Sequence, residues 1–275
     1  MSSTDDNGEV GLSWATAILA FIEAEASAAQ LQAKVDRGTV ADPWLDPLFY
    51  LKIYPAGVLA CSSDVMTASA FDVYTGQLSY RASLGDTIEN HHLSATLSRG
   101  MFTDNRSLRI ADIMDGLSNT VQYMEMASGM GRGRYDPTGS MLLQVNGVNY
   151  ASDRPNDCRA AWSSADATFE PGAELTGTRW ADGRPYYASA VTALPPNGPK
   201  CASGGGDLQW GVYTAGSRHP GGCHVAMGDG SVRFVTESID SGYGEARGSS
   251  NLIGPSPYGV WGSMGTRDGK EVIGE

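Results

Sequence analysis

Three residues in the last third of the chain have side chains that can perform acid–base or nucleophilic chemistry. Ser217, His219 and Asp229 supply a hydroxyl, an imidazole and a carboxylate, which are the groups of a hydrolytic triad. The flanking sequence has neither a Gly-x-Ser-x-Gly turn nor an evident oxyanion-hole loop. The pattern therefore favours a structural role, in which His219 hydrogen-bonds backbone at the base of a hairpin and Asp229 caps its turn. We expect no enzymatic activity.

The hairpin itself is indicated by two runs with apolar residues at alternate positions, 223–228 and 231–237. Asp229 and Gly230 lie between these runs. An Asp-Gly pair in this position is a strong local signal, because a two-residue type I′ turn needs positive φ at both central residues. The sequence predicts a β-hairpin with that turn, and His219 precedes it at a Pro-Gly-Gly corner.

A second polar segment, 115–120, offers oxygen atoms that a cation could use. Asp115 and Asn119, together with Glu125, suit calcium, which takes six to eight oxygen ligands from such loops. The acidic spacing is not that of an EF-hand. The competing interpretation, which we favour, is a tight turn in which Gly116 adopts a special backbone angle and the side chains of Ser118 and Asn119 satisfy backbone groups. Calcium is the one cofactor that the sequence suggests.

The four cysteines form no Cys-x-x-Cys pair, so a zinc-ribbon pattern is absent. An even number in a loop-rich chain is compatible with two disulfides, and hence with an oxidising compartment. Four buried free thiols are the alternative. Cys158 and Cys201 flank one long irregular segment and are the preferred pair, with Cys61 and Cys223 as the second and weaker pair.

The composition bounds the partners. The chain of 275 residues carries 19 Lys and Arg against 31 Asp and Glu, a formal net charge of −12. Because an acidic surface repels phosphate, we expect no nucleic-acid partner and no docking on anionic lipid. Charged residues are few at 18%, whereas 35 Gly and 13 Pro point to many loops and short strands. This balance suits an extracellular or cell-surface protein, with the periplasm as an alternative.

The elements that must position these residues can be placed along the chain. Residues 1–10 read as a flexible tail. Apolar residues at helical spacing predict one amphipathic helix from Trp14 to Val35, with Ser13 as its N-cap. Strands are expected at 120–126 and 141–148, a loop-rich insertion covering one sheet face at about 151–206, and a Gly/Ser-rich docking arm at 241–275. The longest apolar stretch, 15–21, is too short to span a bilayer.

Several short motifs in a fixed order resemble a bacterial pseudopilin-like family of unknown function, which has an N-terminal prepilin methylation helix and a C-terminal His-x9-Asp-Gly element. The motifs are Gly11-Leu12-Ser13-Trp14, Cys61-Ser62-Ser63-Asp64, Ser79-Tyr80-Arg81, Gly100-Met101-Phe102, Asp115 to Thr120 with Glu125, Pro195-Pro196-Asn197 with Cys201, and His219 to Gly230. Ser62 stands where the family has proline, and the opening residues are polar and acidic where the family has a long apolar helix. The resemblance implies a single pilin-like α+β domain over 11–240, with an N-terminal helix packed on an antiparallel sheet.

With no catalytic apparatus in view, the resemblance implies an exported structural protein. We expect a subunit of an extracellular filament, tube or pseudopilus-like assembly linked to type II secretion, with copies of itself as partners. The alternative is a secreted binding module that presents an aromatic groove to a carbohydrate or another solute. The chain is rich enough in aromatic residues for either, with 6 Trp and 12 Tyr.

Overall fold

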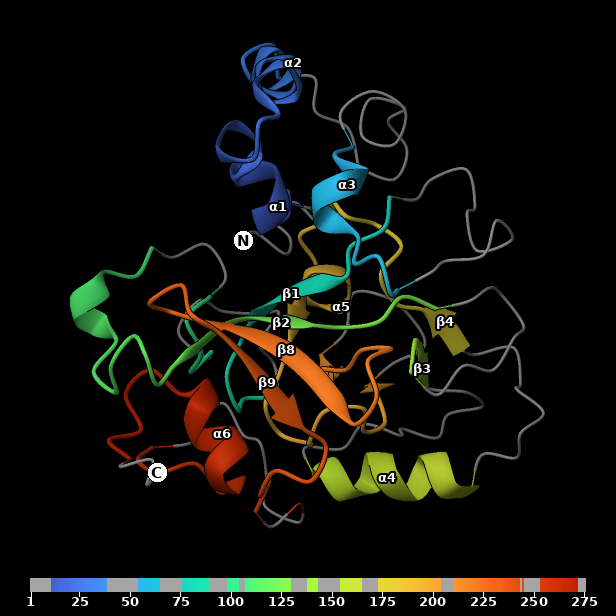
Figure 1. Cartoon of the computed structure of the whole chain (residues 1–275), viewed down its shortest axis with the longest axis vertical. Coiled ribbons are helices and arrows are strands. Elements are labelled where there is room, and N and C mark those ends of the chain that lie inside the picture. The colour runs from blue at the N-terminus through green and yellow to red at the C-terminus, as the bar shows by residue number, and fades with distance from the viewer. Residues whose placement is uncertain are drawn as a thin grey trace.

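The chain folds into an α+β structure (Figure 1). In this computed structural model the described residues are 11–38, 54–64, 76–89, 98–103, 107–129, 138–142, 154–164, 173–203, 210–242, 244 and 253–271. The expected tail, 1–10, lies outside these ranges. Within them, no helix has the length and apolar character needed to cross a bilayer.

The larger sheet has the strand order β5-β1-β2-β8-β9 within the described residues. Its strands are β1 (Tyr80–Ser83), β2 (Val121–Glu125), β5 (Ser189–Ala190), β8 (Gly222–Met227) and β9 (Val232–Thr236). Neighbouring strands are antiparallel, except that β5 runs parallel to β1. A smaller sheet has the order β4-β3-β6-β7, with strands β3 (Ser140–Leu142), β4 (Ala173–Leu175), β6 (Cys201–Ala202) and β7 (Gly211–Val212). The strand predicted at 120–126 exists as β2. Of the strand predicted at 141–148, the first two residues lie in β3 and the others lie outside the described residues.

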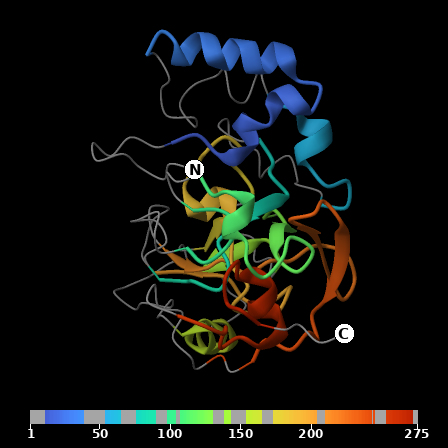
Figure 2. The same cartoon turned by 90° about the vertical axis from the view of Figure 1, so that its left-hand side faces the viewer.

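Helices cover both faces of the larger sheet. The helical elements are α1 (Trp14–Ala17), η1 (Leu19–Phe21), α2 (Glu25–Val35), α3 (Ala56–Leu59), η4 (Ile110–Asp112), α4 (Pro155–Ser164), α5 (Pro185–Ala188) and α6 (Gly259–Gly265). On one face Trp14 of α1 packs against Tyr123 of β2, with ring centroids 4.5 Å apart. On the other face Met124 and Val225 pack with Trp261 of α6. In Figures 1 and 2, α2 lies at one end of the long axis of the molecule, and α4 and α6 lie at the other.

The N-terminal helix is not continuous, which corrects the expectation of one helix from Trp14 to Val35. Glu23 adopts a left-handed backbone with φ of 58°, and the amide of Ala24 donates to the carbonyl of Leu19. This is the pattern with which a helix ends, although Gly usually occupies the left-handed position. The break points Leu19 into the core and leaves Phe21, expected on the buried face, 85% exposed.

Residues 151–206 do more than cover a sheet face with loops. Their described part contains α4, α5 and the strands β4, β5 and β6, and β5 extends the larger sheet at β1. Trp180, Tyr186 and Tyr187 in this region are all buried. The region is therefore more than a cover of loops, because it also supplies part of both sheets and of the core.

The C-terminal hairpin is present as β8 and β9, but its turn differs from the expected one. Ala226 pairs with Val232, the amide of Gly230 donates to Met227, and the amide of Met227 donates to Ser231. Only Gly230 has positive φ (85°), so the turn has three residues and ends in a left-handed glycine. The two-residue type I′ turn is excluded, because it would also require positive φ at Asp229.

The described residues of the expected arm pack into their own chain. Trp261 is fully buried and its Nε1 donates to the carbonyl of Leu194 at 2.7 Å. Tyr258 is buried in the adjoining cluster with Leu194 and Val212. Tyr258 and Trp261 thus anchor this segment in the core of its own chain.

Candidate functional site

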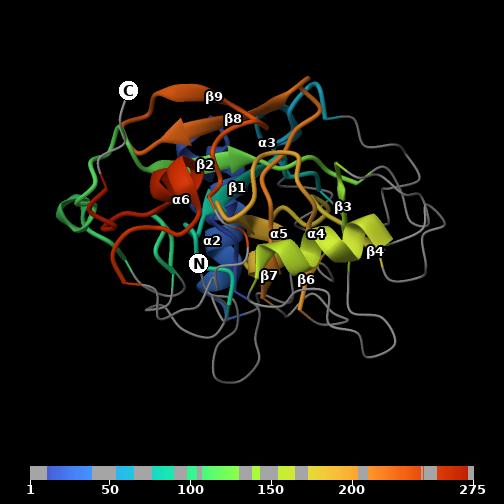
Figure 3. The same cartoon turned by 90° about the horizontal axis from the view of Figure 1, so that it is seen from below.

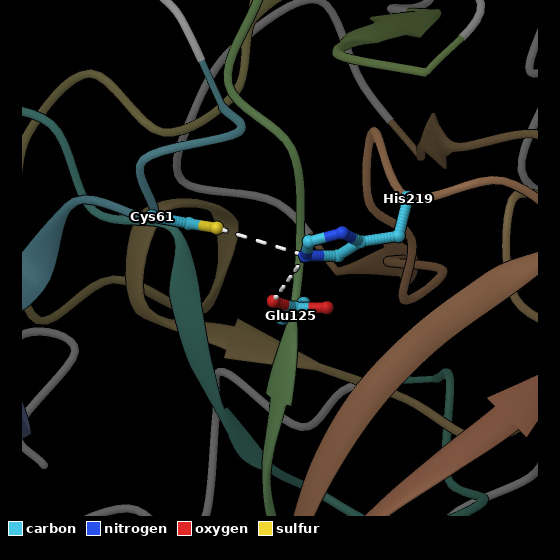
Figure 4. Close-up of side chains that lie close together, drawn as sticks. All are labelled: Cys61, Glu125 and His219. Carbon is cyan, nitrogen blue, oxygen red and sulfur yellow. Dashed lines mark hydrogen bonds and ion pairs between the residues drawn. The ribbon is translucent and has the colours of Figure 1, made fainter.

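Three distant parts of the chain bring chemically versatile side chains together beside the end of β2. Cys61 follows α3, Glu125 is the last residue of β2, and His219 lies in the loop before β8. Nε2 of His219 lies 3.8 Å from Sγ of Cys61 and 3.4 Å from Oε1 of Glu125. Figure 4 shows the three side chains pointing toward a common point. We call these three residues the Cys–Glu–His cluster.

The buried carboxylate of Asp64 fixes the loop that carries Cys61. It accepts hydrogen bonds from the hydroxyl of Ser79 (2.7 Å) and the amide of Ser128 (2.9 Å), and Nε of Arg218 lies 3.3 Å from it. Arg218 also donates to the carbonyl of Ser128 at 2.6 Å. The amide of Cys61 in turn donates to the hydroxyl of Ser79 at 3.0 Å. This network ties the cysteine loop to the segments that flank β1 and β2.

Glu125 is held by the neighbouring strand. The β2–β8 register places His224 opposite Glu125, and the amide of His224 donates to Oε2 at 2.7 Å. Nδ1 of the same histidine lies 3.3 Å from Oε2. Since Oε2 is occupied in this way, Oε1 is the oxygen that faces His219.

The loop before β8 places His219 through a local hydrogen-bond pattern. The hydroxyl of Ser217 donates to the carbonyl of Gly222 and accepts from the amide of His219. The ring of His219 packs edge-on against that of His224, with centroids 4.9 Å apart. The hydrogen bond from the backbone amide of His219 and the contact of its ring with that of His224 therefore orient the imidazole.

The site has a negative electrostatic character. Burial raises the pKa of the half-buried Tyr80, and the nearby Cys61, Glu125 and Asp64 raise it further by opposing a new negative charge. Arg218 and the buried Arg81 both interact with Asp64 and offset part of this negative charge. Such surroundings favour a bound cation over a bound anion.

The geometry does not match a cysteine–histidine–acid triad. In a triad one imidazole nitrogen faces the nucleophile and the other faces the acid, whereas here Nε2 approaches both Cys61 and Glu125. The adjacent cavity is about 10 Å³, the space of one water-sized species. The three ligand-type atoms lie within 4.8 Å of one another, an arrangement that can hold a metal ion.

The two residues of the His-x9-Asp-Gly pattern do not meet. His219 precedes β8 and Asp229 follows it, and a six-residue strand spans roughly 17 Å. Asp229 does cap the turn, because its Oδ1 accepts from the amide and the hydroxyl of Ser231. The side chain of His219 faces Cys61 and Glu125 and not the backbone of the hairpin base. The hydroxyl of Ser217 forms its hydrogen bonds with backbone groups and not with the imidazole of His219.

The expected cation loop behaves as a tight turn. Gly116 has φ of 91°, and Nδ2 of Asn119 donates to the carbonyl of Asp115 at 3.0 Å, while Ser118 is exposed. The carboxylate of Asp115 accepts from the amides of residues 269 and 270, both at 2.7 Å. Glu125 lies at the far end of β2, so the set of Asp115, Asn119 and Glu125 is not assembled.

One of the two proposed disulfides is present. Cys158 of α4 and Cys201 of β6 are bonded, with Cα atoms 5.8 Å apart, whereas Cys61 and Cys223 are free. The second pairing is wrong for a geometric reason. Successive residues of a strand point to opposite faces of the sheet, so Cys223 points into the core while His224 shares the opposite face with Glu125 and Cys61.

Sequence reasoning identified each member of the Cys–Glu–His cluster separately but not the cluster. Cys61, Glu125 and His219 belong to three of the short motifs that carry the resemblance. Asp64 shares the motif of Cys61, and Ser79 belongs to the next motif along the chain. The site could have been predicted from the motifs themselves, because each contributes a polar side chain that a solvent-exposed loop does not require.

Residues 1–242 match the family described as "Protein of unknown function (DUF1559)". The chain belongs to the DUF1559 family. The match extends over the Cys–Glu–His cluster and the whole C-terminal hairpin, and it ends before α6. No curated protein and no solved structure matches the chain.

Proposed function

We propose that this DUF1559 protein is an exported structural protein, a subunit of an extracellular filament, tube or pseudopilus-like assembly formed by self-association. Support comes from family membership, from the α+β fold, and from a disulfide that suits an oxidising compartment outside the cytoplasm. In the Cys–Glu–His cluster one imidazole nitrogen of His219 approaches both Cys61 and Glu125, which is not the order of a catalytic triad.

The observation that carries the proposal is the exposed edge strand β9. It pairs with β8 alone among the described strands and forms the outermost ribbon on one side of the molecule in Figure 3. Val232 is 66% exposed and Phe234 is 44% exposed. Apart from the exposed Arg233, β9 carries none of the charges or prolines with which folded proteins usually protect such an edge, and an open edge is a template for pairing with another chain.

The opposite edge of the sheet cannot play the same part. Ser189 and Ala190 of β5 are buried within their own chain, so β9 of one copy has no exposed β5 edge on which to dock. Pairing of two β9 strands would be self-complementary and would close as a dimer. A filament then requires that β9 contact a different surface of the next copy, or that a second contact link such dimers.

Light scattering and negative-stain microscopy over a range of concentrations test the proposal. We expect concentration-dependent assembly that Phe234→Lys abolishes. Phe21→Lys is the matched control, because Phe21 is also an exposed phenylalanine (85%) but lies in η1. A wild-type chain that stays monomeric at every concentration contradicts the function, and assembly that survives Phe234→Lys contradicts the role of β9.

The alternative of an aromatic groove for carbohydrate has no support among the described residues. Trp180, Tyr186, Tyr213 and Trp261 are buried in the core and offer no face to a sugar. A surface cleft of about 500 Å³ lies beside the hairpin turn, and its described lining mixes aliphatic and polar side chains, with one phenylalanine and no Trp or Tyr.

A further inference from the structure

We propose that the Cys–Glu–His cluster binds a zinc ion through Sγ of Cys61, Oε1 of Glu125 and Nε2 of His219. This site is additional to the proposed assembly role and does not depend on it. Each step below rests on the geometry of the described residues.

Two of the three distances between the ligand atoms are close to those of a tetrahedral site, and all three atoms lie within 4.8 Å of one another. Zinc bonds of about 2.3 Å to sulfur and 2.0–2.1 Å to nitrogen or oxygen separate neighbouring ligand atoms by about 3.4–3.6 Å at tetrahedral angles. Nε2 of His219 lies 3.4 Å from Oε1 of Glu125 and 3.8 Å from Sγ of Cys61. An ion fits among them once Sγ of Cys61 and the carboxylate of Glu125 move closer to each other.

Hydrogen bonding alone explains the convergence poorly. A neutral imidazole nitrogen either donates one hydrogen bond or accepts one, yet Nε2 of His219 faces both a thiol and a carboxylate oxygen. If Nε2 donates to Glu125, the sulfur of Cys61 meets no acceptor lone pair there. If Nε2 accepts from Cys61, its lone pair also faces that of Glu125. A cation between the three atoms uses all three lone pairs at once.

Surrounding contacts hold the ligands in place as they do in established metal sites, where ligands are oriented by further hydrogen bonds. The amide and Nδ1 of His224 lie 2.7 and 3.3 Å from Oε2 of Glu125, the oxygen that does not face His219. The loop of Cys61 is fixed through Ser79 and Asp64.

The donor set selects the metal. One thiolate, one imidazole and one carboxylate suit zinc, whereas calcium and magnesium take oxygen ligands. Both Cys61 and His219 are partly exposed, so an ion can enter from solvent. Three protein ligands leave a fourth position for water or for a group from another molecule.

The test uses the untagged full chain with its disulfide intact, stripped with a chelator and kept anaerobic so that Cys61 stays reduced. Titration with Zn²⁺ against a chromophoric competitor should give one ion per chain. Co²⁺ should produce a thiolate-to-cobalt absorption band that Cys61→Ser abolishes. Cys223→Ser is the matched control, because it removes the other free thiol and should keep the band.

Affinity measurements on the remaining ligands complete the assignment. Glu125→Gln and His219→Ala should each weaken Zn²⁺ binding by at least about tenfold. The double variant His91→Ala/His92→Ala, which removes the two histidines of the chain other than His219 and His224, should bind as the wild type does. If a ligand variant fails to fold, alkylation of Cys61 in the folded wild type should block the ion instead. Absence of stoichiometric binding, or a cobalt band lost with Cys223 and kept without Cys61, overturns the proposal.

Discussion

Sγ of Cys61 lies 3.8 Å from Nε2 of His219, although 158 positions separate the two residues. The contact exists only when β1, β2 and β8 are paired in the observed order, because Cys61 is tied to Ser79 before β1 and His219 precedes β8. The pair therefore reports on the assembled sheet as well as on the local chemistry.

The two free thiols should differ in reactivity. Burial raises the pKa of the Cys223 thiol, with a further contribution from Glu125, and its side chain is inaccessible. Since the thiolate is the reactive species, iodoacetamide should label only Cys61 in the native protein and both residues after unfolding. Mass spectrometry of the tryptic peptides measures this. Equal labelling rates in the native state would mean that Cys223 is not held in the core.

The turn of the hairpin should make stability depend on pH. Hydrogen bonds from the hydroxyl and amide of Ser231 lower the pKa of Asp229 below its ordinary 3.8. Its contribution is fully present above pH 3.8 and is lost as the pH falls through the lower folded-state pKa. Asp229→Ala should therefore lower the urea midpoint at neutral pH, and its difference from the wild type should vanish in strong acid.

Ser231→Ala should reproduce part of this effect, because it removes one of the two donors. Asp268→Ala removes another exposed aspartate and serves as the charge control. A difference between Asp229→Ala and the wild type that does not change with pH would show that the carboxylate charge is not involved.

The sequence predicts what local rules determine. The hairpin was predictable because alternating apolar residues and an Asp-Gly pair are local signals. The type of turn depends on which residues pair across the hairpin, here Ala226 with Val232, and the alternation does not determine that pairing. The helix break at Glu23 was missed because a left-handed helix end normally carries glycine. The sequence therefore predicts the α+β class better than it predicts where each helix and strand begins and ends.

The candidate site depends on strand order, and this is why it was not predicted. Nothing near Cys61 in sequence indicates that β2 lies between β1 and β8, or that Glu125 and His224 face the same side. The sequence also does not show which face of the sheet each residue occupies, and for this reason Cys61 and Cys223 were paired in the predicted second disulfide. Cys158 and Cys201 were found because they bracket one segment of the chain.

The disulfide should contribute strongly to stability. Cys158 and Cys201 are 43 positions apart, and closing a loop of that length in the unfolded chain stabilises the folded state by about 4 kcal/mol in the chain-entropy treatment. The double variant Cys158→Ser/Cys201→Ser should lose about that much in urea unfolding. A reductant should then destabilise the wild type and leave the double variant unchanged, and an equal response of both would assign the effect elsewhere.

Two neighbouring residues of α6 test whether the C-terminal segment belongs to its own chain. Trp261 is fully buried and donates to Leu194, whereas Val260 is 38% exposed. Trp261→Ala should lower the free energy of unfolding by about 3–5 kcal/mol, as truncation of a buried aromatic does. Val260→Ala should stay within about 0.5 kcal/mol of the wild type. Denaturant unfolding at low protein concentration measures both. If α6 instead docked on a neighbouring copy, Trp261→Ala would impair assembly and leave the unfolding of the dilute monomer unchanged.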